Sequence, residues 1–92
     1  MKEFDNAQLE SAIREDMRGE LEAINQYDLH YRSTDNPAAR AIWKSIRDEE
    51  KVHFAELLTL LTYISPKECK FLNEGEREAK EIIKQTTQGE YD

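Results

Sequence analysis

The stretch that decides the fold runs from Ala39 to Ile64 and reads ARAIWKSIRDEEKVHFAELLTLLTYI. Alternating steps of four and three residues select one series of positions in it, which is Ala39, Trp43, Ile46, Glu50, His53, Leu57, Leu60 and Ile64. Such a heptad series is typical of a helix that packs along its length against other helices. A carboxylate and an imidazole therefore occupy two positions that are expected to face inward.

A second heptad series precedes the first. The same steps select Ile13, Met17, Glu20, Ile24, Tyr27 and Tyr31, so this stripe also contains one carboxylate. Helix starts are indicated by Asp5 with Gln8, a capping-box pattern, and by Asn36 and Ser65, each followed by proline. We predict helices over about residues 6–33, 37–64 and 66–88, with Gly75 interrupting the third and residues 89–92 frayed.

Length and composition fit a small all-α domain. Ninety-two residues make one domain, and three glycines with two prolines offer too little turn chemistry for a many-stranded sheet. We predict a two-helix antiparallel hairpin followed by a short C-terminal helix. A chain this short buries only about 60% of its unfolded surface, so a partner chain or a bound metal is expected to stabilise it.

The charge balance favours cations as ligands. Twenty acidic and thirteen basic residues give a net charge of −7, which argues against binding to nucleic acid or anionic membranes. No apolar run approaches the roughly 20 residues of a membrane span, and Met1–Asp5 lacks the order of a secretory signal. Cys69 is the single cysteine, so neither an internal disulfide nor a four-cysteine metal site is expected. We expect a soluble, intracellular protein.

Three ionisable residues on core-facing positions require compensation. An unpaired charge in an apolar interior costs several kcal/mol. Glu50 and His53 form Glu-x-x-His, whose two side chains share one helical face and can meet on one metal ion. Carboxylate oxygen with imidazole nitrogen suits Fe(II), Mn(II) or Zn(II). Together with Glu20, the pair predicts a metal site.

The predicted ligands are half of a dinuclear set. Di-iron carboxylate bundles use one Glu from each of two helices and one Glu-x-x-His from each of the other two. Two copies of this chain, related by a two-fold axis, would supply four helices, four carboxylates and two imidazoles. We therefore predict a homodimer that forms a four-helix bundle, with the metal site between its subunits.

Two segments carry these residues: Gly19–Tyr27, GELEAINQY, and Arg47–His53, RDEEKVH. Together they resemble the metal-binding segments of the encapsulated ferritins, a half-ferritin family in the ferritin-like superfamily that also includes the rubrerythrins. The resemblance covers roughly Leu9 to Ile64. It implies a single ferritin-like domain over residues 1–92, a di-iron ferroxidase centre at a dimer interface, and a ring-shaped decamer inside a cytoplasmic encapsulin nanocompartment.

The resemblance also assigns residue roles. It makes Glu20, Glu50 and His53 the iron ligands and catalytic residues, each used twice by symmetry, and it places Tyr27 beside the centre. Relatives also have a secondary cation site on the first helix, for which Ca, Mn or Zn are further candidate ions. Glu22 matches part of that site, whereas Gly19 and Gln26 depart from it, because relatives can carry Glu and Trp at these two positions.

The expected function is ferroxidase activity for iron storage and detoxification. Two Fe(II) ions would bind between the ligand sets of two subunits, react with dioxygen and leave as Fe(III). A chain of this size cannot enclose a mineral core, so storage requires a separate compartment, for which the resemblance suggests an encapsulin shell. Residues 88–92, QGEYD, offer no evident apolar docking peptide, so the sequence leaves delivery to a shell open.

Several alternatives stay open at this stage. The trio could stabilise a non-catalytic Zn or Mn helical dimer, make interchain hydrogen bonds in a purely structural protein, or belong to a rubrerythrin-like, peroxide-handling di-iron protein. The last would lack the four-cysteine domain that rubrerythrins usually add. Outside the trio, the structural interpretation is favoured at each position: core packing for Tyr27, Tyr31 and Trp43, a solvated carboxylate for Glu56, and a surface position for His30.

Overall fold

Three helices make up the part of the chain that the computed structural model describes, residues 2–87. They are α1 (Asn6–Arg32), α2 (Pro37–Ile64) and α3 (Pro66–Thr87). Residues 2–87 contain no strand, which confirms the all-α prediction. None of these helices is both long enough and apolar enough to cross a membrane.

Side-chain caps fix where the first two helices begin. The Asp5 carboxylate accepts a hydrogen bond from the Gln8 backbone N–H at 2.8 Å, and the Gln8 side chain accepts one from the Asp5 N–H at 3.0 Å. The Asn36 side chain accepts from the Ala39 N–H at 3.0 Å, with Pro37 in the first turn. These caps occupy N–H groups that have no partner inside the helix, so the predicted helix starts are confirmed.

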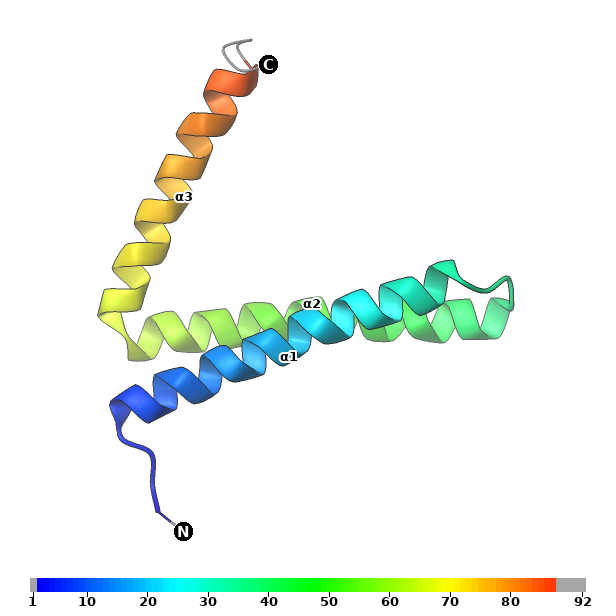
Figure 1. Cartoon of the computed structure of the whole chain (residues 1–92), viewed down its shortest axis with the longest axis horizontal. Coiled ribbons are helices and arrows are strands. Elements are labelled where there is room, and N and C mark those ends of the chain that lie inside the picture. The colour runs from blue at the N-terminus through cyan, green and yellow to red at the C-terminus, as the bar shows by residue number, and fades with distance from the viewer. Residues whose placement is uncertain (1, 88–92) are drawn as a thin grey trace.

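Helices α1 and α2 form an antiparallel hairpin (Figure 1). The turn between them is tied down by Arg40, whose Nη1 donates to the carbonyls of Tyr31 at 2.9 Å and Thr34 at 3.2 Å. The Arg40 guanidinium carbon also lies 4.1 Å from the centre of the Tyr31 ring, within the range of a cation–π contact. Arg40 of α2 therefore links its helix to the end of α1 and to the turn between them.

The hairpin has a thin core. Ile13 and Leu61 are the buried apolar residues within the described part of the chain. Leu61 is 3% exposed, whereas Leu60, the predicted core position, is 42% exposed. The prediction was wrong there because a straight helix has 3.6 residues per turn, so a strict seven-residue series drifts by about 20° per heptad. After three heptads, the residue that faces α1 is therefore Leu61, one position after the predicted Leu60.

Helix α3 leaves the end of α2 at a sharp angle and projects away from the hairpin (Figure 1). Its first turn is capped by the Ser65 hydroxyl, which accepts from the Glu68 N–H at 3.2 Å, and Arg14 of α1 pairs with Glu68 at 2.8 Å. The helix runs unbroken through Gly75, so the predicted interruption there was wrong. Gly75 keeps an ordinary helical backbone, and one glycine costs only about 1 kcal/mol relative to alanine. The predictions for residues 88–92 lie outside the described residues.

Candidate metal centre

The structure brings together Glu20, Glu50 and His53. One ligand atom from each lies within 4.8 Å of the other two. His53 Nδ1 is 3.5 Å from Glu50 Oε2 and 3.7 Å from Glu20 Oε2. The predicted meeting of these side chains is therefore present within a single chain, while their role as ligands stays a prediction.

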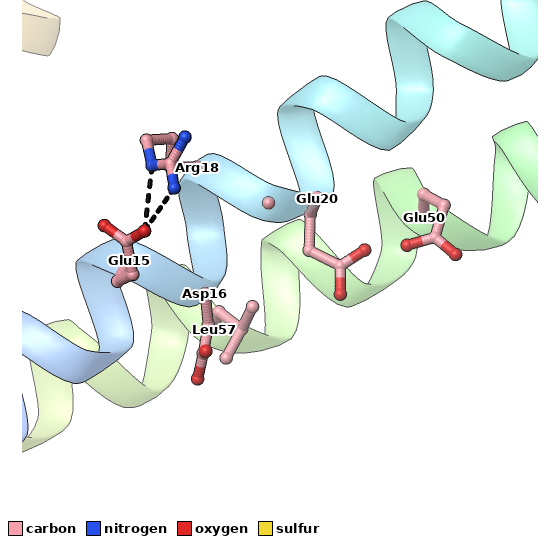
Figure 2. Close-up of a pocket in the computed structure, with 7 residues that line it drawn as sticks. Glu15, Asp16, Arg18, Glu20, Glu50 and Leu57 are labelled. Atoms are coloured by element: carbon pink, nitrogen blue, oxygen red, sulfur yellow. Dashed lines mark hydrogen bonds and ion pairs between the residues drawn. The ribbon is translucent and has the colours of Figure 1, made fainter.

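Two helices position the three side chains. Glu20 lies near the middle of α1 and Glu50 near the middle of α2, so the antiparallel hairpin sets them opposite each other (Figure 2). His53 is three residues after Glu50, which places it about one turn further along the same side of α2. The two carboxylates are shielded, with side chains 22% and 19% exposed, whereas the His53 side chain is 48% exposed.

One oxygen of this cluster has no hydrogen-bond partner within the described part of the chain. Glu20 Oε2 is buried and accepts no hydrogen bond from the described residues. Its separation from His53 exceeds the usual hydrogen-bond length, and neither Glu20 nor Glu50 pairs with a lysine or arginine of residues 2–87. A buried carboxylate oxygen without a partner is destabilising, and a divalent cation would relieve this. Two carboxylates with one imidazole are a fitting donor set for such a cation.

The two carboxylates of the trio, Glu20 and Glu50, line an open groove of about 410 Å³. Its lining residues are Glu15, Asp16, Arg18, Gly19, Glu20, Glu50 and Leu57. Figure 2 shows the carboxylates of Glu20 and Glu50 directed into the same space between the two helices, and Arg18 turned back along α1 to Glu15. With five of its lining residues ionisable and four of those acidic, the groove favours cations.

Glu22 is engaged away from the cluster. Arg18 bridges Glu15 and Glu22 on the surface of α1, and the hydrogen bond from Arg18 holds the pKa of Glu15 below its ordinary value. The Glu22 side chain is exposed. The structure does not bring Glu22 to the trio, and a secondary cation site at Glu22 stays a prediction.

The aromatic residues and His30 pack the hairpin. His30 is half-buried and its ring centre lies 5.2 Å from that of Trp43, so the predicted surface position was wrong. His30 was predicted to be a surface residue because it has no paired carboxylate, but the ring of Trp43 on α2 covers its imidazole. Tyr31 lies against two arginines, and Tyr27 is half-buried on α1. Glu56 is exposed, as expected for a solvated carboxylate.

One pair close to the trio was missed in the sequence. Arg47 of α2 donates through Nη1 to Asp28 Oδ1 of α1 at 2.8 Å, and its side chain is only 14% exposed. Asp28 follows stripe residue Tyr27, and Arg47 follows stripe residue Ile46. Opposite charges at equivalent places beside the two stripes were the signal that could have identified the pair.

Comparison with known proteins finds similarity to three proteins whose names refer to encapsulins. It is 33% identical over 74 residues to the encapsulin nanocompartment cargo protein EncC of Myxococcus xanthus, covering 80% of this chain and 57% of that protein. It is 31% identical over 81 residues to a ferritin-like–encapsulin shell fusion protein of Pyrococcus furiosus, covering 88% of this chain and 24% of that protein. It is 39% identical over 49 residues to the encapsulin nanocompartment cargo protein EncB of Myxococcus xanthus, covering 53% of this chain and 31% of that protein.

These relatives are longer than this chain, which spans from about a quarter to just over half of their length. No family model matches the chain, and no solved structure matches it. The similarity is thus to encapsulin-associated proteins, among them one with a ferritin-like part, and it does not single out a half-ferritin.

Proposed function

We propose that this chain is an encapsulin cargo protein that oxidises Fe(II) to Fe(III) with dioxygen at a two-iron site shared by two copies. The observation that carries the proposal is the convergence of Glu20, Glu50 and His53 around a buried Glu20 oxygen that accepts no hydrogen bond from residues 2–87. The similarity to encapsulin cargo proteins and to a ferritin-like fusion supports the same assignment.

The surface beside the trio supports a shared site. Ile42 and Leu60 are exposed apolar residues of α2, and they lie 11 residues before and 7 residues after His53. These spacings are close to three and two helical turns, so all three side chains emerge on one face of α2. An apolar flank on both sides of a half-exposed ligand suits contact with a second copy, whose trio would complete the site.

The exposed area also supports association. The chain exposes 7403 Å², about 1,900 Å² more than the roughly 5,500 Å² expected for a compact chain of its mass. A standard interface buries about 800 Å² on each partner. The shape explains this surplus, because the chain measures 56 × 46 × 15 Å and is therefore about one helix thick. Contact with further copies would bury the surplus.

The chemistry follows from charge and ligand type, with iron as the substrate. Two copies would supply four carboxylates, whose four negative charges balance the four positive charges of two Fe(II) ions. Each ion gives one electron to dioxygen, which takes up two protons from solvent and leaves as hydrogen peroxide, and the combined charge of the two ions rises to six. The site is then left with two uncompensated positive charges, which favours departure of Fe(III) as product.

Each side chain has a part in this scheme. Carboxylate oxygens bind iron in both oxidation states, and the Glu20 and Glu50 carboxylates lie close enough to reach a common ion. His53 presents Nδ1 toward both carboxylates and fixes the third direction of the ligand set. The Fe(III) product would be deposited in a shell compartment. Ca, Mn and Zn are candidate ions for secondary sites on the chain.

The test is oxidation of Fe(II) by the purified chain in air. Rapid dioxygen consumption together with the absorbance of a dinuclear ferric species is the expected result. A zinc- or manganese-stabilised structural dimer would bind metal without consuming dioxygen. A peroxide-handling protein would oxidise the bound Fe(II) faster with hydrogen peroxide than with dioxygen, so comparing the two oxidants distinguishes these functions.

A further inference from the structure

Asp28 and Arg47 form a charged pair that joins the two long helices close to the trio. Asp28 lies eight residues after Glu20 on α1, about 12 Å along the helix, and Arg47 lies three residues before Glu50 on α2. Arg47 Nη1 donates to Asp28 Oδ1 at 2.8 Å, and Arg32 Nε donates to Asp28 Oδ2 at 2.9 Å. Both carboxylate oxygens of Asp28 are thus occupied, which fixes its orientation.

Arg47 is held equally firmly. Its Nε donates to Asp48 Oδ1 at 3.1 Å, and its guanidinium carbon lies 5.1 Å from the centre of the Tyr31 ring. Arg40 lies over the same ring at 4.1 Å. The Arg47 side chain is 14% exposed, which makes it a well-shielded arginine in a chain with few buried residues. Its position is therefore set by contacts with both helices.

Near the turn, Arg40 of α2 donates to the Tyr31 carbonyl of α1, whereas the buried apolar residues Ile13 and Leu61 have little directional preference. Within residues 2–87, Asp28–Arg47 is the arginine–carboxylate pair that joins α1 to α2. Two heptad stripes can pack in more than one register, and polar pairs beside such stripes are a known means of selecting one. A shift in register would separate Glu20 from Glu50, because each helix contributes one of these carboxylates.

We propose that Asp28 and Arg47 are positioning residues that set the register of the metal-binding trio. This inference rests on the proposed function of the trio as a metal site. Metal sites require their ligands to be held within about 0.5 Å of the productive geometry. An ion pair with a well-shielded arginine also contributes to folding, so the test needs a readout of ligand geometry besides a readout of folding.

The test is titration of the full chain with Co(II), whose visible absorption reports the geometry of its ligands. Asp28→Asn and Arg47→Gln remove the pair. Glu76→Gln and Lys80→Gln are matched controls, because they make the same charge changes in an exposed pair within α3, where Lys80 Nζ lies 2.7 Å from Glu76 Oε1. Far-UV circular dichroism checks that all variants remain helical.

The first two variants are expected to bind Co(II) about 10- to 100-fold more weakly, with an altered absorption band, while the controls match the parent chain. The double variant should be no weaker than either single variant, because the two residues act as one unit. Arg47→Lys retains the positive charge and should therefore bind Co(II) more tightly than Arg47→Gln, though less tightly than the parent chain. If Arg47→Gln fails to fold, Asp28→Asn and Arg47→Lys still decide the question.

Three outcomes would overturn the inference: parent-like affinity and spectrum in the pair variants, equal weakening in the α3 controls, or additive losses in the double variant. Failure of the proposed function has a different signature. A parent chain that binds Co(II) but does not oxidise Fe(II) would contradict the ferroxidase proposal, and the titration would still judge the positioning role. A parent chain that binds no Co(II) would contradict both.

Discussion

His53 Nδ1 lies 3.7 Å from Glu20 Oε2, a buried oxygen that accepts no hydrogen bond from the described residues. The two residues are 33 positions apart in the chain and come from different helices. A gap of this length is too long for a hydrogen bond, yet it fits two ligands on either side of one ion. A buried carboxylate oxygen without a partner is unfavourable, and the proposed cation would supply the missing interaction.

Removal of a ligand should abolish iron oxidation and leave the fold intact. We expect Glu50→Ala and His53→Ala to oxidise Fe(II) no faster than the same buffer without protein, because each change removes two ligands from a two-fold symmetric site. Dioxygen consumption measures the rate, and far-UV circular dichroism measures helical content. Glu56→Ala is the matched control, since Glu56 is an exposed carboxylate one turn after His53. Parent-like oxidation by either ligand variant would refute the site.

Assembly should depend on metal and on the apolar flank of α2. Metal that binds between two chains stabilises the associated form by mass action, so anaerobic Fe(II) should raise the mass measured by light scattering. Leu60→Glu places a charge on the exposed flank beside His53 and should weaken that response. A single mass with and without Fe(II) would contradict a shared site.

Replacement of Glu20 should make the metal-free chain more stable while abolishing iron oxidation. We expect Glu20→Met to raise the free energy of unfolding of the metal-free chain by about 1 kcal/mol, because it removes a buried oxygen without a partner and keeps a good helix former. The same variant should lose iron oxidation. Urea unfolding in the presence of a chelator measures the first effect. A less stable metal-free variant would show that Glu20 is satisfied without metal.

The Asp28–Arg47 contact should weaken in acid. Hydrogen bonds from Arg32 and then Arg47 hold the pKa of Asp28 below its ordinary value of 3.8. Because the folded-state pKa is the lower one, the stabilisation is fully present above pH 3.8 and is lost as the pH falls through the lowered value. The urea midpoints of the metal-free parent and Asp28→Asn should therefore differ at pH 6 and converge as the pH falls below the lowered pKa of Asp28. A difference that does not vary with pH would exclude this linkage.

Local chemistry explains why the helix starts and the trio were predictable from sequence. The caps at Asp5 and Asn36 act within four residues, and two heptad stripes are enough to place Glu20 opposite Glu50. The direction of α3 was not predictable, because it depends on one short connection after α2. The shift from Leu60 to Leu61 and the covering of His30 by Trp43 depend on how two helices drift around each other.

The measurement that tests the central claim most directly is native mass spectrometry of the iron-loaded chain, read for the number of metal ions per pair of chains. A site completed by the trios of two copies predicts two iron ions for every two chains, and none in Glu50→Ala. Iron bound to single chains, or iron retained by Glu50→Ala, would contradict a shared two-iron centre.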